Sequence, residues 1–392
     1  MVRIVTQTLL FIIGDLDTGG AERHLVQVLP RLARDRFRPV VYTLSHKGVL
    51  APLLENAGIP VIAPPGSAWL RRWPGPLGRR GLLLVISMTR LIILMRSQRP
   101  SVVHFFLPEA YVAGGLCALA AGCPTRIMSR RSLNVYQAQR PLAARVERWL
   151  HRRMTAVLGN STAVIGELRA EGVAEDRLGL LYSGVDLSAF TGTPANDGGN
   201  LNMVVVANLI PYKGHADLLD ALGGIRDKMP EGWVLNCVGR DGGYGEALRA
   251  RAATLGIADN VHWLGERDDV PAILGQAHLG ILCSHQEGFS NSIIEAMAAG
   301  LPMVVTDVGG NREAVIDEAT GLVVPSHDPT ALGAAILALA LDPDRCGAMG
   351  AAARERARDI FSMETCVAEY EHLYDGLVIG DIRPVADILQ RT

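Results

Sequence analysis

The chain has 392 residues, of which 49% are apolar and 20% charged. With 42 glycines and 21 prolines, this composition excludes a disordered chain and indicates a compact α/β protein with many tight turns. The length suits two domains of about 150 to 200 residues each. The six cysteines lack C-x-x-C spacing and histidine partners at ligand spacing, so we expect neither a zinc site nor a disulfide framework, which fits a reducing cytoplasm.

Charge is distributed unevenly along the chain, although the formal net charge is only -2. Residues 1–180 carry 24 Lys and Arg against 11 Asp and Glu, whereas residues 181–392 carry 14 against 29. The basic half fits a surface for anionic lipid or a phosphorylated acceptor. Attraction between two domains explains the same asymmetry. Composition leaves both explanations open.

The first half alternates short apolar runs with longer amphipathic segments, which is typical of parallel strands joined by crossover helices. We expect buried strands at 9–14, 39–44, 61–63, 101–106, 126–129 and 156–159. The apolar N-terminus lacks the basic segment and cleavage site of a signal peptide, so it is interpreted as the first strand.

The longest apolar run covers residues 82–95 and contains Arg90. Its 14 residues fall short of the roughly 20 needed to cross a bilayer. It therefore predicts either a buried helix or an interfacial one. Trp69, Trp73 and four arginines precede it, where an interfacial anchor would have them.

The second half repeats the alternation after a segment rich in Gly, Ser, Thr, Asn and Pro. We expect strands at 202–207, 233–238, 261–265, 279–284, 303–306 and 322–324. The resulting division has an N-terminal Rossmann-like domain, a linker, a C-terminal Rossmann-like domain and a tail for which a return to the first domain is one option, at 1–183, 184–200, 201–375 and 376–392. In such folds ligands bind at the carboxyl ends of the strands.

The segment 284–310 is the most informative, because an acidic loop follows a strand and leads into a helix. Glu287-Gly288 permits a sharp turn, after which the amides of Phe289, Ser290 and Asn291 can converge on phosphate oxygens at the helix start. The pattern predicts a pyrophosphate site.

Glu295 follows Glu287 by eight residues, and eight helical steps rotate about 80° and climb about 12 Å. Two helical carboxylates at that spacing would not share one small ligand. We therefore expect Glu287 on the loop and Glu295 one turn into the helix. An alternative is a capping box of Ser292 and Glu295, in which the carboxylate only satisfies a backbone amide.

This segment resembles the signature of the GT-B retaining glycosyltransferases of family 4: Glu, seven residues, Glu, a small-residue helix and a Pro-led strand. The resemblance covers nearly the whole chain. It implies a GT-B architecture of two Rossmann-like doubly wound domains facing a cleft, with retaining transfer from a nucleoside diphosphate sugar to a hydroxyl of a glycan or lipid-linked acceptor. It also implies that Glu287 binds hydroxyls of the donor sugar and that Glu295 binds the ribose.

Further donor-side matches follow from the same resemblance. Lys213 stands where the family places a lysine for the diphosphate, whereas Asn208 occupies the position that usually holds an arginine. Residues 261–267, ending in Arg267, resemble the element beside the nucleobase, and Gly309-Gly310-x-x-Glu313 resembles the loop after the acidic pair. Ordinary turn and cap chemistry explains these last two matches equally well.

On the acceptor side, Gly19-Gly20 resembles the family's glycine-rich loop, and Tyr182–Asp186 resembles its hinge with Ser183 in place of Asn. The histidine that family members often carry after the strand at 126–129 is absent, since the chain reads Ser129-Arg130-Arg131. His104 ends the preceding strand and has either a polar role in the site or a structural one. Arg130 or Arg131 is an alternative phosphate ligand, and the sequence does not choose between them.

The catalytic candidates are thus Glu287, Lys213, His104 and Arg130. No D-x-D element falls at the proposed site, so we expect no cofactor and no metal requirement. Expected partners are a UDP- or GDP-sugar, a glycan or lipid-linked acceptor and anionic membrane at the cytoplasmic face, but no nucleic acid. A nucleotide-sugar epimerase and a non-catalytic nucleotide-sugar-binding protein are the alternatives. An NAD-linked oxidoreductase is disfavoured because no G-x-G-x-x-G follows the first strand.

Overall fold

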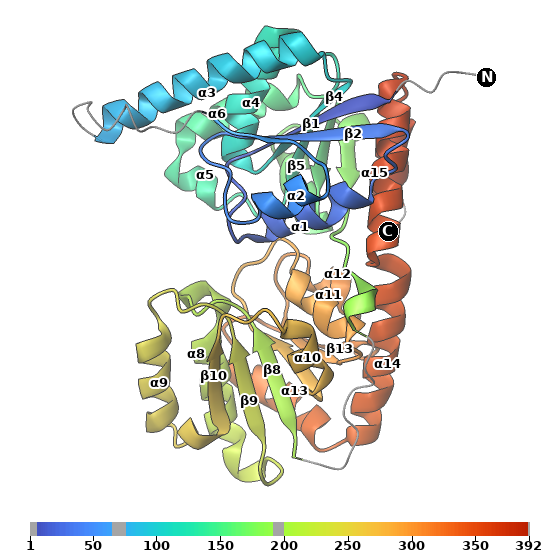
Figure 1. The fold of residues 1–392 in the computed structure, drawn as a ribbon. Coiled ribbons are helices and arrows are strands. Elements are labelled where there is room, and N and C mark those ends of the chain that lie inside the picture. Colours follow the sequence, from blue (N-terminus) through green and yellow to red (C-terminus); the bar gives the residue numbers. More distant parts are fainter. Residues whose placement is uncertain (1–5, 65–75, 191–199, 391–392) are drawn as a thin grey trace. The chain divides into compact units, whose positions relative to one another are not determined.

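The computed structural model describes residues 6–64, 76–190 and 200–390, which form two compact units (Figure 1). The first unit comprises Met1–Gly184 and Cys366–Thr392, and the second comprises Val185–Thr365. This division places residues 366–375 in the first unit, whereas the sequence analysis assigned them to the second. The two units are described separately below.

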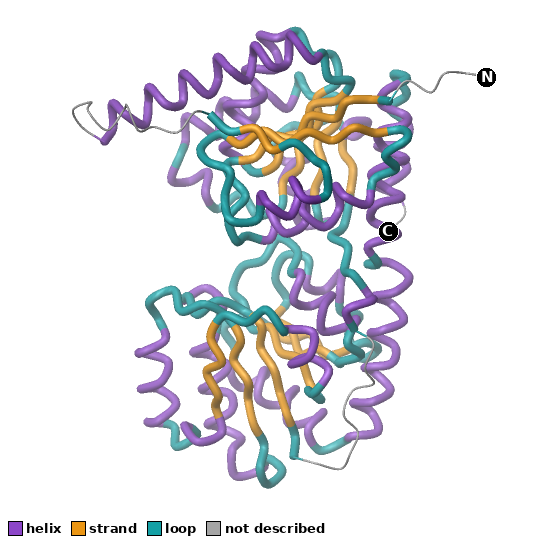
Figure 2. Tube along the Cα trace, viewed as in Figure 1, coloured by secondary structure: helices purple, strands orange, loops and turns teal. Residues whose placement is uncertain are grey.

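The first unit contains a parallel sheet of seven strands in the order β3-β2-β1-β4-β5-β6-β7. Figure 2 shows the strands of this unit in orange with helices around them. Strand β4 is buried along its whole length, as expected for a parallel sheet with both faces covered. The strand order reverses direction between β1 and β4, which creates a doubly wound switch point. The strands are β1 Gln7–Ile13, β2 Phe37–Thr43, β3 Val61–Ile62, β4 Val102–Phe106, β5 Arg126–Arg130, β6 Ala156–Gly159 and β7 Leu178–Leu180.

Helices cover this sheet on both faces, with α3, α4 and α6 on one side and α1 and α2 on the other (Figure 1). Proline at the first position of α3, α4 and α6 suits a helix start because its missing N–H has no intrahelical partner there. The helices are α1 Gly20–Val28, α2 Ala51–Asn56, α3 Pro76–Gln98, α4 Pro108–Ala121, α5 Tyr136–Gln139, α6 Pro141–His151, α7 Thr162–Ala170, α15 Met363–Val378 and α16 Arg383–Gln390, with 3₁₀ turns at Leu29–Arg31 and Glu175–Arg177.

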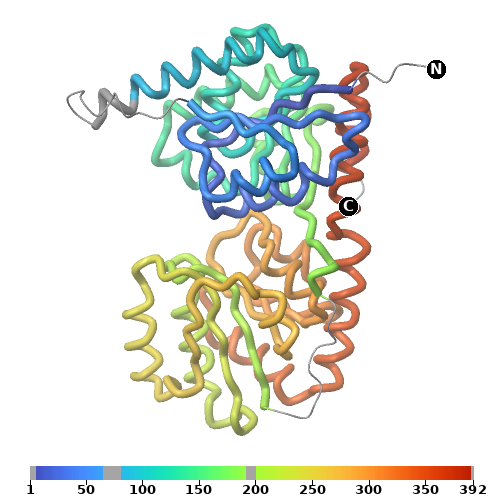
Figure 3. The backbone as a smooth tube through the Cα atoms, viewed as in Figure 1, coloured from blue at the N-terminus to red at the C-terminus, as the bar shows by residue number. Residues whose placement is uncertain are grey.

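The C-terminal segment completes the first unit, where it lies beside the first strands (Figure 3). Arg36, which precedes β2, forms ion pairs with Glu371 and Asp375 of α15. The ring of Tyr374 packs edge-on against Phe11 and lies against Phe37. The end of the chain therefore belongs to the core of the unit that its beginning builds.

The second unit contains a parallel sheet of six strands in the order β10-β9-β8-β11-β12-β13. Its switch point lies between β8 and β11. The strands are β8 Asn202–Val206, β9 Val234–Val238, β10 Val261–Gly265, β11 Leu279–Leu282, β12 Met303–Thr306 and β13 Gly321–Val324. The helices are α8 His215–Ile225, α9 Gly245–Thr254, α10 Val270–Gly275, α11 Asn291–Ala298, α12 Asn311–Ala314, α13 Pro329–Ala340 and α14 Pro343–Ile360, with 3₁₀ turns at Leu187–Ala189, Pro211–Lys213, Arg226–Lys228 and Ala258–Asn260.

The predicted fold class is confirmed, because each unit is a doubly wound parallel α/β domain and every expected strand is present. Strand β7 was not expected. The start of the expected linker is integrated into the second unit, since Val185 N–H donates to the carbonyl of Phe361 at 2.8 Å. Residues 191–199 of that linker lie outside the described residues.

Helix α3 contains the apolar run and is longer than that run suggested, at 23 residues. Its segment Gly81–Gln98 has the length and apolar composition of a membrane-crossing helix, with mean hydropathy 1.4, yet only 17% of it is buried in the unit. Leu91 and Met95 are buried, whereas Leu84 and Val85 are exposed. One face of α3 packs in the unit, as expected for a buried helix. The other face exposes apolar side chains, as expected for an interfacial helix. Trp69 and Trp73 lie outside the described residues.

Candidate active site

The acidic loop of the second unit follows β11 at the switch point and ends where α11 begins. Glu287 is nearly buried there, and its Oε1 accepts hydrogen bonds from Lys213 Nζ at 2.5 Å and from Ser284 Oγ at 2.7 Å. Lys213 belongs to the loop after the neighbouring strand β8. Two adjacent strand ends thus bring a carboxylate and a cation together, which are the two residues that the sequence singled out.

Two glycines allow neighbouring loops to press against this acidic loop. Gly214 and Gly309 have φ angles of +72° and +52°, a region that side chains disfavour. A Cβ atom at either position would lie 1.8 Å from a carbonyl oxygen of the loop, that of Cys283 or that of Glu287. Gly310 N–H also donates to the carbonyl of Gly288 at 2.8 Å. The Gly309-Gly310 match therefore has a physical basis: it supports the backbone that carries Glu287.

Helix α11 begins at Asn291 with Ser290 as its N-cap residue. The side chain of Ser290 makes no capping hydrogen bond, and the amides at the helix start together with the positive end of the helix dipole suit an anion. Ser292 lies inside the helix and its Oγ is 2.9 Å from that of Ser290, which makes the capping-box alternative wrong. Glu295 is half-buried and lies one turn after Asn291, as the sequence predicted.

The other donor-side candidates take part in contacts within the second unit. Asn208 Oδ1 accepts from the backbone N–H of Arg240 at 3.1 Å, so this side chain joins the loops after β8 and β9. Arg267 forms a bidentate pair with Asp269 at 2.7 and 2.6 Å on the exposed surface. Their roles toward a ligand stay predictions.

In the first unit, His104 is buried and both ring nitrogens have partners. Nδ1 lies 2.9 Å from the hydroxyl of Tyr374 and Nε2 lies 2.7 Å from Oγ of Ser129. Burial, assisted by the positive charge of Arg131, lowers the pKa of His104 to about 3, so the imidazole is neutral. This position argues against contact with a substrate. The catalytic hypothesis for His104 is corrected to a role in the core.

Arg130 is also fully buried, which corrects its expected role as a phosphate ligand. Its guanidinium donates two hydrogen bonds to Glu171, at 2.6 and 2.8 Å, and one to Glu147 at 3.0 Å. Burial alone would raise the pKa of Glu171, but hydrogen bonds from His151 and Arg130 hold it well below its usual range. Both terminal nitrogens of the guanidinium, Nη1 and Nη2, thus donate to carboxylates of the same unit.

The glycine-rich loop of the first unit begins α1, with Gly19 as the N-cap residue. A Cβ atom on Gly19 would lie 2.0 Å from Oε2 of Glu22, so the carboxylate folds back over the loop. Burial raises the pKa of Glu22. Sequence analysis gave Glu22 no role, although its three-residue spacing from Gly19 was the available signal. Gly20 has open space where a side chain would begin.

Two family models match consecutive parts of the chain. Glycosyltransferase Family 4 matches residues 18–189, and Glycosyl transferases group 1 matches residues 193–356. The chain belongs to the group 1, family 4 glycosyltransferases. It is therefore a glycosyltransferase of the hexosyltransferase type, and the alternatives raised from the sequence are not favoured.

Curated relatives of this glycosyltransferase are similar over most of their length. A D-inositol 3-phosphate glycosyltransferase of Streptomyces scabiei is 28% identical over 92% of this chain and 87% of its own. A GDP-mannose-dependent alpha-(1-6)-phosphatidylinositol monomannoside mannosyltransferase of Mycobacterium tuberculosis is 28% identical over 91% and 95%.

This glycosyltransferase has the same GT-B fold as several proteins of solved structure. Anabaena HepE in complex with UDP and glucose has a TM-score of 0.80 at 22% identity, covering 94% of this chain and all of that one. Sucrose-phosphate synthase from Thermosynechococcus elongatus has a TM-score of 0.75 at 22% identity, covering 96% of this chain and all of that one.

Sequence analysis of the glycosyltransferase missed a cluster beside the acidic loop. His285 Nε2 lies 2.8 Å from Asp217 Oδ2, and the rings of His285 and His327 are 3.7 Å apart. Residues of these types can bind a divalent cation, as can Asp15, Asp17 and His46 in the first unit. The expected independence from metal stays a prediction.

Proposed function

We propose that this glycosyltransferase transfers a hexosyl unit, with retention at the anomeric carbon, from a UDP- or GDP-sugar to a hydroxyl of a glycan or lipid-linked acceptor. The observation that carries the donor side is the contact of Lys213 with Glu287 beside the amides that begin α11. It supports a ligand that combines a diphosphate with sugar hydroxyls.

Each group of this cluster has a distinct role in the proposal. Lys213 and the amides of Phe289, Ser290 and Asn291 stabilise the negative charge that develops on the diphosphate leaving group. Glu287 accepts hydrogen bonds from hydroxyls of the sugar, and Glu295 accepts those of the ribose. The leaving group is thus held by fixed positive charge and dipoles, and we expect transfer to proceed without a divalent cation.

Names of relatives support the two substrates. One curated relative is GDP-mannose-dependent and acts on a phosphatidylinositol mannoside, another is named for D-inositol 3-phosphate, and HepE was solved with UDP and glucose. These names agree with a nucleotide sugar as donor. They also favour a phosphorylated or lipid-linked acceptor, for which a peripheral position at the cytoplasmic face of a membrane is suitable.

A thermal-shift series with UDP, GDP, ADP and their sugars tests the donor side, because a ligand that binds only the folded state stabilises it by about 2.7 kcal/mol at 100 times its Kd. We expect one nucleotide and its sugar to raise the Tm. Absence of a shift with all of them contradicts the proposal. NMR of the anomeric proton of the product then distinguishes retention from inversion.

A further inference from the structure

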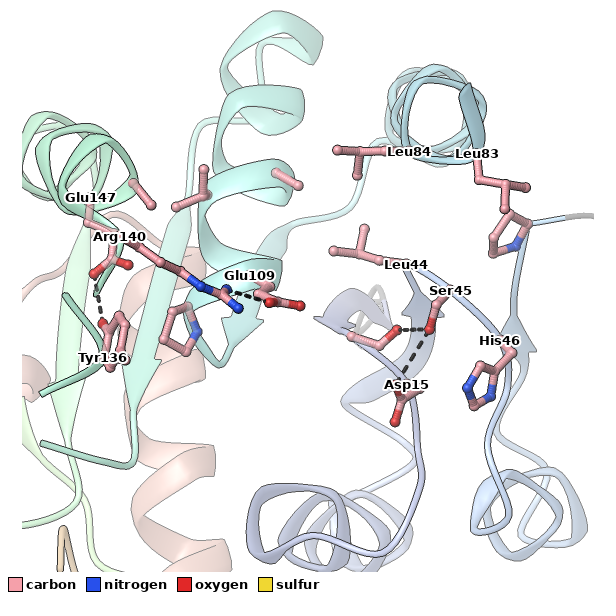
Figure 4. Close-up of a pocket in the computed structure, with 16 residues that line it drawn as sticks. Asp15, Leu44, Ser45, His46, Leu83, Leu84, Glu109, Tyr136, Arg140 and Glu147 are labelled. Atoms are coloured by element: carbon pink, nitrogen blue, oxygen red, sulfur yellow. Dashed lines mark hydrogen bonds and ion pairs between the residues drawn. The ribbon is translucent and has the colours of Figure 1, made fainter. Parts of the chain in front are cut away.

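The first unit contains a cavity of about 730 Å³ near the carboxyl ends of β1 and β2. Helices α3, α4 and α6 contribute to its walls (Figure 4). Its apolar lining includes Leu44, Leu83, Leu84, Pro108, Val112 and Ala113. Protein interiors rarely leave voids much larger than a water molecule, whereas ligand pockets occupy about 300–1,000 Å³. The size and lining of this cavity are those of a site for an apolar group.

Polar side chains form two groups in the lining of the cavity. Arg140 and Glu109 form an exposed ion pair at 2.6 Å, and Ser45 Oγ lies 3.4 Å from Asp15 Oδ2. Figure 4 shows these two pairs on opposite sides of the cavity, with Leu44, Leu83 and Leu84 near Ser45. Carboxylates and a guanidinium can exchange hydrogen bonds with the hydroxyls of a sugar. The cavity therefore combines apolar walls with polar groups suited to a hydroxylated head.

Helix α3 connects the cavity with the outer surface of the unit. Leu84 lines the cavity and is 44% exposed, and the next residue, Val85, is 59% exposed without lining it. An apolar chain that enters the cavity beside Leu84 would thus meet apolar surface along its path as well as at its end.

We propose that this cavity binds the hydrocarbon portion of an amphiphilic acceptor whose hydroxylated head lies at Asp15, Ser45, Glu109 and Arg140. That the amphiphile is the acceptor of the reaction rests on the proposed function. Its binding to the cavity does not. Water in an apolar cavity finds few hydrogen-bond partners. Its displacement by a hydrocarbon chain is therefore favourable. The apolar walls select the tail and the polar groups orient the head.

Titration of the full chain with hexyl, octyl and decyl glucoside, each below its micelle concentration, tests the proposal by calorimetry. Each further buried methylene tightens binding roughly fourfold. We expect this increase to continue until the chain fills the cavity. Affinity that does not depend on chain length, or absence of binding by all three glucosides, overturns the proposal.

Two matched pairs of variants distinguish the cavity from the outer surface. Leu84→Gln places a polar group on the lining, and Val85→Gln makes the same change on the adjacent outward position. Val112→Trp fills the cavity, whereas Leu116→Trp lies one turn further along α4 and outside the lining. We expect the first variant of each pair to weaken decyl glucoside binding at least about tenfold, and the second to leave it near wild type.

Equal losses within a pair would show adsorption to the outer surface of α3 or α4 and would overturn the proposal. Nucleotide-induced thermal shifts, measured on the same proteins, separate the two proposals. Chain-length-dependent glucoside binding without any nucleotide shift would refute the proposed function and leave the cavity site standing. A nucleotide shift without glucoside binding would refute the cavity site alone. Preserved unfolding profiles of Leu84→Gln and Val85→Gln show that the comparison is made on folded protein.

Discussion

Lys213 Nζ and Glu287 Oε1 lie 2.5 Å apart, and this contact joins the loops that follow β8 and β11. Their side chains are only 18% and 10% exposed, so each holds the other in place in surroundings with little water. Removal of one member of such a pair leaves a charge poorly compensated. In the proposed function, a diphosphate and a sugar hydroxyl offer both groups replacement partners when the donor binds.

Replacement Glu287→Gln keeps the size of the side chain and removes its charge. We expect the rate of transfer to fall about 10- to 100-fold, because a hydrogen bond to a charged group contributes roughly 1.5–3 kcal/mol. Binding of the free nucleotide, which lacks the transferred sugar, should stay near wild type. Steady-state kinetics and calorimetry with UDP or GDP measure the two effects. Unchanged transfer would remove Glu287 from the site.

The replacement Glu295→Gln should weaken nucleotide binding, which Glu287→Gln leaves near wild type. If Glu295 accepts the ribose hydroxyls, nucleotide affinity falls about tenfold or more for the same reason. A lower melting temperature together with normal nucleotide affinity would assign Glu295 a structural role.

Replacement Gly309→Ala tests whether loop support is needed for donor binding. Alanine at positive φ costs about 1–2 kcal/mol, and its Cβ would also lie 1.8 Å from the carbonyl oxygen of Glu287. The acidic loop must shift, so we expect donor binding to weaken beyond the loss of stability. Gly122→Ala is the matched control, because Gly122 has a φ of +76° and nothing within 4 Å. Equal effects of both variants on donor affinity would contradict the argument.

The strand pattern could be predicted because buried parallel strands are continuous apolar runs. Strand β7 was missed because Leu178–Leu180 is only three residues long and has a glycine at its centre. The environment of His104 was beyond sequence reasoning, since its partner Tyr374 is 270 residues away. The start of α11 was ambiguous because Ser290 and Ser292 are both good N-cap residues, and backbone conformation decides between them. Local pattern thus pointed to Glu287 and the family resemblance to Lys213, whereas the surroundings of His104 and Arg130 depend on long-range packing.

Replacement Arg130→Ala should act on stability. It leaves Glu147 and Glu171 buried without their cation, a change that typically costs about 3–5 kcal/mol. Arg130→Lys restores the charge but not the bidentate geometry, so an intermediate loss is expected. Urea denaturation measures both changes. Normal stability of Arg130→Ala with impaired transfer would restore Arg130 as a substrate ligand.

The stability of the first unit should depend on pH through His104. Its pKa is about 3 in the folded protein and about 6.5 in the unfolded chain, so the unfolded chain binds more protons between these values. The contribution of neutral His104 is fully present above pH 6.5 and falls by about 1.4 kcal/mol per pH unit as the pH drops toward 3. His104→Gln, which cannot be protonated, should lose less stability than wild type between pH 7 and pH 5. His46→Gln, which removes an exposed histidine, is the control. Parallel slopes for wild type and His104→Gln would show that His104 is accessible to protons in the folded state, and would reopen its role in catalysis.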